Sequence, residues 1–408
     1  MKLAVIGGGV TGIVTSILAK EKGYEVTLYE ASKNIGGIIQ DIRIKEDWYF
    51  NNTQYLDVNG ICYKTIERCI SSEFEVFEHN YASITESEHE AIFFEDFAQP
   101  VLTTNLPDIS IFLSASNDIS SRLSSYDEKS KFLLQFAKKF GNLEGLHPAN
   151  LIMMQLSRIF YLNHSEEVKR LKSGENVAND MLGLPRSIIN PDFVKARAAL
   201  PVNGYDKMLE GLYSYLLKIG VELKLDSPVK VTNTKNKVEL YSRRKPIDFD
   251  LAVWSTNPTL LLTNALEHKM SSPSMKMYCA VGRCKFIKEL KPVYIQVFSL
   301  KTSIVRFFLY NDKNETKITI EGFSKFDATT DITVAINKYL RKYYNTYLLS
   351  DLYFDNQTRY TLISKGDYEA MSAYSLNLSS KRILSGSWEL YGRDQKVDSI
   401  VARIGEIY

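Results

Sequence analysis

Three glycines and a glutamate near the N-terminus have the residue types and spacing that hold a phosphorylated ligand. Gly7, Gly9 and Gly12 form a G-x-G-x-x-G pattern, and Glu30 follows in the same stretch. In this pattern the first glycine permits a tight turn, the second lets the backbone approach a pyrophosphate, and the third lets a helix pack closely. The Glu30 carboxylate can accept hydrogen bonds from a ribose diol and would repel a 2′-phosphate. The pattern predicts a dinucleotide site that disfavours NADP.

The elements around these residues support that interpretation. Residues 2–6 are a short apolar run of the kind that forms a buried parallel strand, and residues 24–29 predict a second strand ending at Glu30. Between the two strands, apolar side chains recur at helical spacing. The N-terminus of this helix, at Val10 and Thr11, offers unpaired N–H groups to phosphates. The whole order predicts a Rossmann unit, whereas the glycines alone would also fit ordinary turns.

The loop after Glu30 favours FAD over NAD. It begins with Ala31 and ends in the glycine pair Gly36 and Gly37. This stretch resembles the E-A-x-x-x-x-G-G signature of the superfamily of flavin amine oxidases, protoporphyrinogen oxidases and phytoene desaturases, which UDP-galactopyranose mutase shares. The resemblance implies FAD, with the glycine pair against its pyrophosphate and flavin. We expect the FAD to be non-covalent, because the C-terminal segment contains neither cysteine nor histidine. Ile38 also belongs to the expected cofactor site, but it departs from the arginine or asparagine that is usual there.

Two further segments resemble parts of the FAD domain. The sequence "FNNTQYLD" resembles a polar loop near the flavin, with Asn52 and Thr53 as contacts, and an ordinary turn is the alternative. The sequence "PVNGYDKM" resembles the corresponding mutase segment, and a helix is expected from about Asp206. The resemblance implies that Val229, in the strand region after this helix, packs on adenine.

The C-terminal segment resembles the part of the family that faces the flavin ring. A strand ends near residue 384, Gly386 makes a turn, and residues 397–407 have helical periodicity. The resemblance implies that this helix directs its N-terminus at the flavin pyrimidine ring. We expect the backbone N–H of Val397 at that contact, where a helix N-terminus stabilises negative charge.

These segments predict an α/β fold class with an α+β substrate domain. The resemblance implies that a Rossmann-like FAD-binding domain of the GR2 type, expected at residues 1–60, 200–265 and 360–408, is interleaved with a sheet-plus-helix substrate domain, expected at residues 61–199 and 266–359.

Within the substrate domain the sequence predicts particular elements. Residues 61–197 predict mostly helix, and residues 79–90 within them predict a solvated acidic loop. Residues 275–325 alternate like antiparallel strands, and residues 332–350 predict a helix.

Three residues are candidates for catalysis. Arg306 interrupts an apolar strand pattern. Strand alternation could point it to solvent, or it could clamp a carboxylate or phosphate. Tyr360 and Trp388 are chosen by resemblance, because the family places a cavity-facing strand and aromatic residues at the corresponding positions.

The expected function is that of an FAD-dependent oxidoreductase that moves a hydride from a small molecule to flavin N5. The alternative is a mutase-like flavoenzyme that acts on a nucleotide sugar without net redox change. A third interpretation is a flavoprotein whose nucleotide is only structural. One G-x-G-x-x-G pattern gives no separate NAD(P)H domain.

The composition limits the classes of partner that this protein is expected to bind. The formal net charge of +2 over 408 residues gives no electrostatic case for nucleic acid. Four cysteines and five histidines show no metal-ligand spacing, and no apolar run is long enough to span a membrane. We expect a cytoplasmic protein with a small-molecule substrate, with an anion or a nucleotide sugar as candidates, and a homodimer stays open.

Overall fold

The structure is a computed structural model that describes most of the chain. The described residues are 1–52, 55–78, 80–86, 91–95, 106–108, 110, 119–124, 139–140, 144–150, 154–158, 160–174, 176–189, 196–234, 237–257, 270–324, 330–380, 382–385 and 392–406. The chain divides into two compact units. Unit 1 consists of Met1–Val76, Arg197–Ser271 and Gly366–Tyr408, and unit 2 consists of Phe77–Ala196 and Ser272–Lys365.

Unit 1 is built on a parallel sheet, of which the described residues form five strands. In spatial order these are β10 (Glu222–Lys224), β2 (Glu25–Tyr29), β1 (Lys2–Ile6), β14 (Leu251–Trp254) and β20 (Ile383–Ser385). All residues of β14 and β20 are buried, as expected where both faces of a parallel sheet are covered. The carboxyl ends of the strands lie at one edge, where Ile6 pairs with Trp254 and Trp254 with Ser385.

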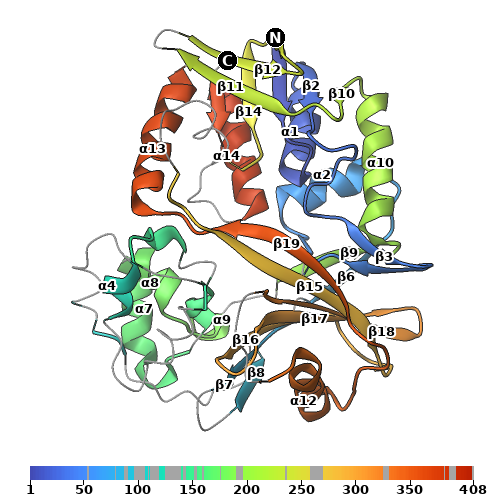
Figure 1. The fold of residues 1–408 in the computed structure, drawn as a ribbon, viewed down its shortest axis with the longest axis vertical. Helices are drawn as coiled ribbons and strands as arrows, with labels where there is room; N and C mark the ends of the chain where they lie inside the picture. The colour runs from blue at the N-terminus through green and yellow to red at the C-terminus, as the bar shows by residue number, and fades with distance from the viewer. Residues whose placement is uncertain are drawn as a thin grey trace. The chain divides into compact units, whose positions relative to one another are not determined.

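Helices and a small sheet cover this parallel sheet. Helix α1 (Val10–Glu21) packs against α14 (Arg393–Glu406) and α2 (Ile61–Cys69) (Figure 1). Alternate side chains of β1 and β14 instead pack against α13 (Lys365–Ser380) and an antiparallel sheet. That sheet contains β11 (Val229–Thr234), β12 (Lys237–Ser242) and β13 (Lys245–Pro246).

The remaining elements of unit 1 surround helix α10 (Gly204–Lys218). The hairpin β3 (Asp41–Ile44) and β4 (Asp47–Phe50) precedes a small sheet of β5 (Leu56–Asp57), β9 (Arg197–Pro201) and β6 (Phe74–Glu78). Helix α10 (Gly204–Lys218) follows β9 and buries Met208, Leu209, Leu212 and Leu216 on one face. The helix expected from about Asp206 is therefore present.

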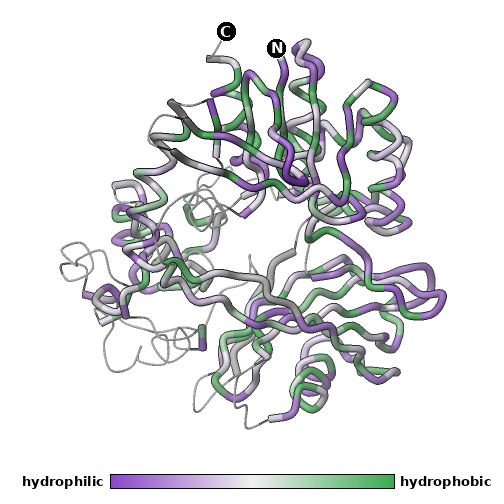
Figure 2. Tube along the Cα trace, turned by 45° about the horizontal axis from the view of Figure 1, so that its top comes forward, coloured by the Kyte–Doolittle hydropathy of each residue, from purple (hydrophilic) through white to green (hydrophobic). Residues whose placement is uncertain are grey.

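Unit 2 contains a mixed seven-stranded sheet within the described residues. Its order is β19 (Tyr353–Thr361), β15 (Ser274–Cys284), β18 (Glu315–Phe323), β17 (Ile304–Asp312), β16 (Val293–Ser299), β7 (Asn80–Glu86) and β8 (Ala91–Glu95). Among the described strand pairs of this sheet, β16 and β7 are parallel and the others are antiparallel. Figure 2 shows that hydrophobic residues recur along these strands.

Helices border both faces of the unit 2 sheet. One face packs against α12 (Ile332–Tyr344), whose Ile336, Tyr339 and Leu340 are buried. The other face packs against a hydrophobic cluster formed by buried side chains between residues 119 and 184. The described helices in this region are α4 (Ile119–Leu123), η2 (Pro148–Asn150), η3 (Leu156–Arg158), η4 (Leu162–His164), α7 (Ser165–Gly174), α8 (Asn176–Met181) and, just beyond it, α9 (Arg186–Ile189). The predicted α/β fold class with sheet and helices in the second part is confirmed.

One local prediction is wrong in the part of unit 2 that the structure describes. Residues 79–90 were expected to be a solvated acidic loop, but β7 lies inside the sheet and Glu86 is buried. Its carboxylate accepts hydrogen bonds from Ser299 Oγ (2.7 Å), Tyr339 Oη (3.0 Å) and Lys338 Nζ (2.7 Å). These partners are distant in sequence, so the local sequence gives no sign of them. The acidic composition alone therefore led to the prediction that the segment is exposed to solvent.

The other differences concern the extent of helices. The mostly helical region expected at 61–197 also contains β6, β7 and β8. Helix α12 ends at Tyr344 instead of near residue 350, because Asn345 adopts a left-handed conformation with φ of 48°. No helix in the described part of the chain is long and apolar enough to cross a membrane.

Candidate functional site

The glycine turn after β1 needs glycine for steric reasons at two positions. Gly7 has φ of +108°, a conformation that L side chains rarely adopt, and its N–H donates to the carbonyl of Tyr29 at 2.8 Å. A Cβ atom on Gly12 would lie 1.9 Å from the carbonyl oxygen of Gly7. The close approach of α1 to β1 therefore requires glycine at position 12.

Gly9 has a different environment. It is the N-cap of α1, and no side chain caps this helix. A Cβ atom on Gly9 would meet no protein atom within 4 Å. The first N–H groups of α1, from Val10 and Thr11, lack intrahelical acceptors and lie beside this open space. Such a helix N-terminus fits a pyrophosphate.

The glycine pair lies against the same turn. Gly36 N–H donates to the carbonyl of Gly8 at 2.7 Å, and a Cβ atom on Gly37 would lie 3.1 Å from Gly9 Cα. Both glycines of the pair have positive φ, +122° and +62°. Residues 36–37 and 7–9 thus form one backbone surface, which explains why glycine recurs in both segments.

Glu30 closes this surface at the end of β2. Its Oε2 accepts the N–H of Gly8 at 2.6 Å, and its Oε1 accepts the N–H and Oγ of Ser32 at 2.8 and 2.9 Å. A carboxylate has about four lone-pair positions, so one more donor can bind. The geometry fits the ribose hydroxyl that the sequence predicts at Glu30.

The other predicted cofactor residues are less closely grouped. Ala31 is exposed on the loop after β2, and Ile38 is 57% exposed. Asn52 is buried with φ of +67°, and its Nδ2 donates to Asn51 Oδ1 at 2.7 Å. Val229 begins β11 and packs beside the cluster formed by β1, β14 and α13. Thr53, Gly386 and Trp388 lie outside the described residues.

The start of the last helix differs from the prediction. Helix α14 begins at Arg393, so Val397 lies one turn inside it and its side chain is fully buried. The N–H groups that lack intrahelical acceptors belong to the first turn, before Val397. The expectation that Val397 presents its N–H at the helix N-terminus is wrong, because the helical periodicity of the apolar residues begins later than the helix.

Two carboxylates that the sequence did not single out cap other helices of unit 1. Asp41 accepts the N–H groups of Tyr205 (3.0 Å) and Asp206 (2.9 Å) at the N-terminus of α10. Asp394, in the first turn of α14, accepts the N–H of Cys62 at 2.8 Å at the N-terminus of α2. Both caps come from distant segments, so no local capping pattern could reveal them.

Replacement of Asp41 should change how stability depends on pH. Burial raises the pKa of Asp41 to about 6, against the lowering effect of the two N–H groups. Because this folded-state pKa exceeds the unfolded value of about 3.9, the stabilising contribution is complete below pH 4 and is lost as pH rises through 6, about 3 kcal/mol in total. We expect Asp41→Asn to remove this part of the pH profile of the unfolding free energy. Parallel profiles of both proteins between pH 4.5 and 7 would contradict the assignment.

Arg306 lies on β17 within the sheet of unit 2. Its Nη2 pairs with Glu321 Oε2 at 2.7 Å, and its Nη1 donates to Tyr294 Oη at 3.3 Å. The side chains of Arg306 and Glu321 are only 11% and 1% exposed. The alternative that alternation points Arg306 to solvent is therefore wrong, and its charge is balanced by a carboxylate. Tyr360 lies in β19 opposite Met275.

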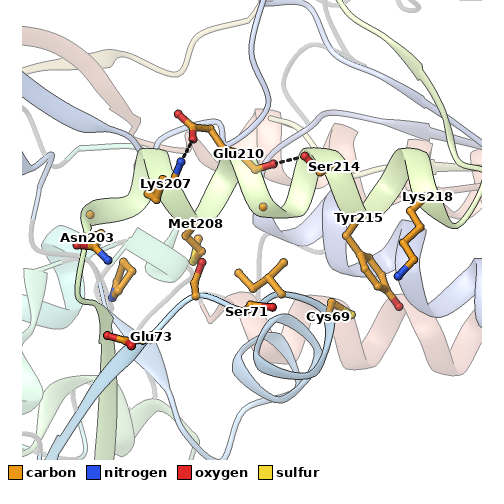
Figure 3. A pocket seen from close by; sticks show the side chains of 15 residues that line it. Cys69, Ser71, Glu73, Asn203, Lys207, Met208, Glu210, Ser214, Tyr215 and Lys218 are labelled. Atoms are coloured by element: carbon orange, nitrogen blue, oxygen red, sulfur yellow. Dashed lines mark hydrogen bonds and ion pairs between the residues drawn. The ribbon is translucent and has the colours of Figure 1, made fainter.

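Unit 1 also has an open groove of about 680 Å³ between α10 and the segment Cys69–Glu73. Figure 3 shows the ion pair of Lys207 and Glu210 and the bond from Ser214 Oγ to the Glu210 carbonyl along its α10 wall. None of the residues predicted for the cofactor lines this groove. It is separate from the glycine surface.

The comparisons with known proteins agree with this geometry. Residues 5–60 match the family model described as an NAD(P)-binding Rossmann-like domain. A segment of 75 residues is 31% identical to 4,4'-diapophytoene desaturase (4,4'-diaponeurosporene-forming) of Staphylococcus aureus strain COL, and it covers 18% of this chain and 15% of that protein. The chain thus spans less than a sixth of that relative's length.

Solved structures match over the whole chain. A protoporphyrinogen oxidase-like protein from Exiguobacterium sp. 255-15 has a TM-score of 0.61 and 13% identity, covering 100% of this chain and 98% of that chain. Reduced UDP-galactopyranose mutase has a TM-score of 0.66 and 11% identity, covering 100% and 95%.

The chain shares its overall fold with these solved structures. The resemblance predicted from residues 30–37 and the predicted Rossmann-like unit are confirmed at the level of the fold. Within this fold, unit 1 carries the glycine surface and Glu30.

Proposed function

We propose that this chain is an FAD-dependent oxidoreductase that oxidises a small molecule by hydride transfer to flavin N5. The observation that carries the proposal is the open backbone surface of unit 1. There, the N-terminus of α1 has no side-chain cap, a Cβ atom on Gly9 would meet nothing within 4 Å, and the Glu30 carboxylate lies beside the same turn. The desaturase and oxidase names among the similar proteins support a redox enzyme.

The chain's own residues would hold the cofactor in a defined order. Glu30 would bind the ribose, the N–H groups of Val10 and Thr11 would bind the pyrophosphate, and the pair Gly36 and Gly37 would admit the ligand closely. Further proposed contacts are Ala31, Ile38, Asn52, Thr53, Val229 and Gly386. When bound, FAD supplies the two-electron chemistry that side chains lack. The protein contributes binding, orientation and electrostatics.

Glu30→Ala should weaken FAD binding. The substitution removes a charged acceptor for the ribose hydroxyl, and such a hydrogen bond contributes about 1.5–3 kcal/mol. We expect the dissociation constant for FAD to rise about 10-fold or more, measured by fluorescence quenching during reconstitution of the purified protein.

Glu25→Ala is the matched control for this experiment. Glu25 lies on the same strand, β2, but at its amino end and exposed to solvent. This variant should bind FAD like the parent. Equal affinity of the Glu30→Ala variant and the parent, with both folded, would contradict the ribose assignment. A parent protein that stays colourless after reconstitution would contradict the proposed function itself.

A mutase-like reaction on a nucleotide sugar is the second candidate. The favouring observation is the TM-score of 0.66 to reduced UDP-galactopyranose mutase over the whole chain. Incubation of the dithionite-reduced protein with UDP-galactopyranose distinguishes the two functions. Sugar isomerisation without net flavin oxidation would support the mutase function and reject the oxidoreductase function. An oxidoreductase would instead be recognised by reduction of its oxidised flavin on addition of substrate.

A further inference from the structure

Large apolar side chains are concentrated on the surface at one end of unit 2. Of the twelve large hydrophobic residues that are exposed in the described part of the chain, five lie near the carboxyl end of β15 and the amino end of β19. They are Phe286 (40% exposed), Tyr347 (40%), Leu349 (61%), Tyr353 (49%) and Phe354 (43%). Single exposed apolar side chains are common, whereas a group of them marks a contact surface. We call these five residues the apolar patch.

Hydrogen bonds hold the segment 345–352 beside the end of β15. The N–H of Lys285 donates to the carbonyl of Tyr347 at 2.9 Å. Leu348 packs against the hydrophobic core that contains α12. Because successive side chains of an extended segment point to opposite faces, Tyr347 and Leu349 are turned outward while the residue between them is turned inward.

The loop between β15 and β16 adds Phe286 to the apolar patch. The N–H of the next residue, Ile287, donates to Thr316 Oγ1 at 2.9 Å, and Asn311 Nδ2 donates to the carbonyl of Ile287 at 2.9 Å. Leu290 of the same loop packs against the core. The backbone beside Phe286 is therefore anchored to β17 and β18, while the Phe286 ring stays exposed.

Cations surround the apolar patch. The segments 283–291 and 341–352 contain six exposed cations and two carboxylates, an excess of four positive charges, although the formal net charge of the whole chain is only +2. The cations are Arg283, Lys285, Lys288, Lys291, Arg341 and Lys342, and the carboxylates are Glu289 and Asp351. Neighbouring strands supply two more carboxylates, since Arg283 pairs with Glu315 at 3.2 Å and Lys291 lies 4.0 Å from Glu78. This end of unit 2 is therefore both apolar and basic.

Lysines and aromatic rings alternate within this surface. The Nζ atom of Lys285 lies 5.9 Å from the centre of the Tyr347 ring, and the Nζ atom of Lys342 lies 5.1 Å from the centre of the Tyr343 ring. A cation over a ring is attracted by the negative face of that ring. The apolar and the basic side chains thus form one surface.

This combination favours a lipid surface over a protein partner. The buried parts of protein interfaces are depleted of lysine. Lysines near an anionic bilayer are instead attracted to it, while aromatic and leucine side chains enter the boundary between headgroups and acyl chains. Tyrosine suits that boundary because its ring is apolar and its hydroxyl is polar.

We propose that this end of unit 2 binds the surface of an anionic lipid bilayer. Phe286, Tyr347 and Leu349 enter the headgroup boundary, and Lys285 and Lys288 lie against the lipid phosphates. The contact is peripheral, and it does not depend on the FAD chemistry proposed above.

The double variant Phe286→Ser/Leu349→Ser tests the apolar part of the contact. We expect the parent to sediment with vesicles of equimolar phosphatidylcholine and phosphatidylglycerol. The affinity of the double variant for these vesicles should fall about tenfold or more, because two side chains no longer enter the lipid. Leu217→Ser/Val334→Ser is the matched control. It changes two side chains outside the apolar patch that are 51% and 61% exposed, and it should bind like the parent.

The double variant Lys285→Gln/Lys288→Gln tests the electrostatic part. Its affinity for the same vesicles should also fall about tenfold or more, since each lysine near an anionic surface contributes to binding. Lys230→Gln/Lys245→Gln removes as many exposed charges from β11 and β13 of unit 1 and should bind like the parent. Salt should weaken binding of the parent, and vesicles of phosphatidylcholine alone should bind it weakly.

Three outcomes would overturn the lipid contact. The first is a parent that does not sediment with the anionic vesicles. The second is equal affinity of both patch variants and their controls, which would place the contact on another surface. The third is a parent that forms dimers instead of binding vesicles, with patch variants that are monomeric, because a second copy of the chain would then cover the apolar patch. FAD binding by the same proteins is measured separately and decides the proposed function.

Discussion

Gly12→Ala is expected to unfold or strongly destabilise unit 1. A Cβ atom at this position would lie 1.9 Å from the carbonyl oxygen of Gly7 and 2.7 Å from Ser255 Oγ. The first contact is with backbone, so relief requires α1 to move away from β1, where both elements are buried. We expect a loss of about 3 kcal/mol or more in the free energy of unfolding, measured by urea denaturation with circular dichroism.

Gly366→Ala is the matched control, since Gly366 also lies in the first turn of a helix. A Cβ atom there would meet nothing within 4 Å, and the position has no positive φ. This variant should be as stable as the parent or up to about 1 kcal/mol more stable. A Gly12→Ala protein with the stability of this control would contradict the close packing described here.

Gly9→Ala gives a further contrast at the same turn. Because a Cβ atom on Gly9 meets only open space, the variant should fold like the parent, yet it should bind FAD more weakly if the pyrophosphate occupies that space. The two glycines of one motif would thus have separable roles, one in packing and one in binding.

Glu321→Gln is expected to have the second large effect on stability. Glu321 and Arg306 are cross-strand neighbours on β18 and β17, and their side chains are almost completely buried. Removal of the carboxylate charge leaves the guanidinium in a poorly solvated position, which typically costs about 3–5 kcal/mol. We expect a decrease of that order in the unfolding free energy of the variant.

A matched pair on the same strand serves as the control. Glu315, also on β18, pairs with Arg283 at 3.2 Å, but both side chains are more than 40% exposed. Glu315→Gln should therefore change stability by less than about 1 kcal/mol. The double variant Arg306→Met/Glu321→Leu should recover most of the loss, because apolar side chains can replace a buried ion pair. Equal effects of Glu321→Gln and Glu315→Gln would reject the buried-pair interpretation.

The sequence by itself determined the glycine turn and the position of Glu30. These features follow from local sterics: Gly7 needs a positive φ, Gly12 must admit the Gly7 carbonyl, and Glu30 ends the strand beside the turn. Each constraint acts within one strand–helix–strand unit, so residue type and spacing were enough to predict it. Helix α10 was predictable for the same reason, since its buried residues recur at helical spacing.

Only the tertiary structure decided the groups whose partners are distant in the chain. Asp41 caps α10 across 164 residues, and Glu86 is buried by Ser299 and by residues of α12, although its neighbours in sequence suggested solvent. The start of α14 at Arg393 is likewise visible only in the fold, where Asp394 caps α2. Sequence patterns report the burial of apolar side chains, but a buried charge has the same residue type as a solvated one. The environment of a charged side chain is set by partners that folding brings together. The sequence therefore determined the local glycine turn, and only the tertiary structure decided which charged groups are buried.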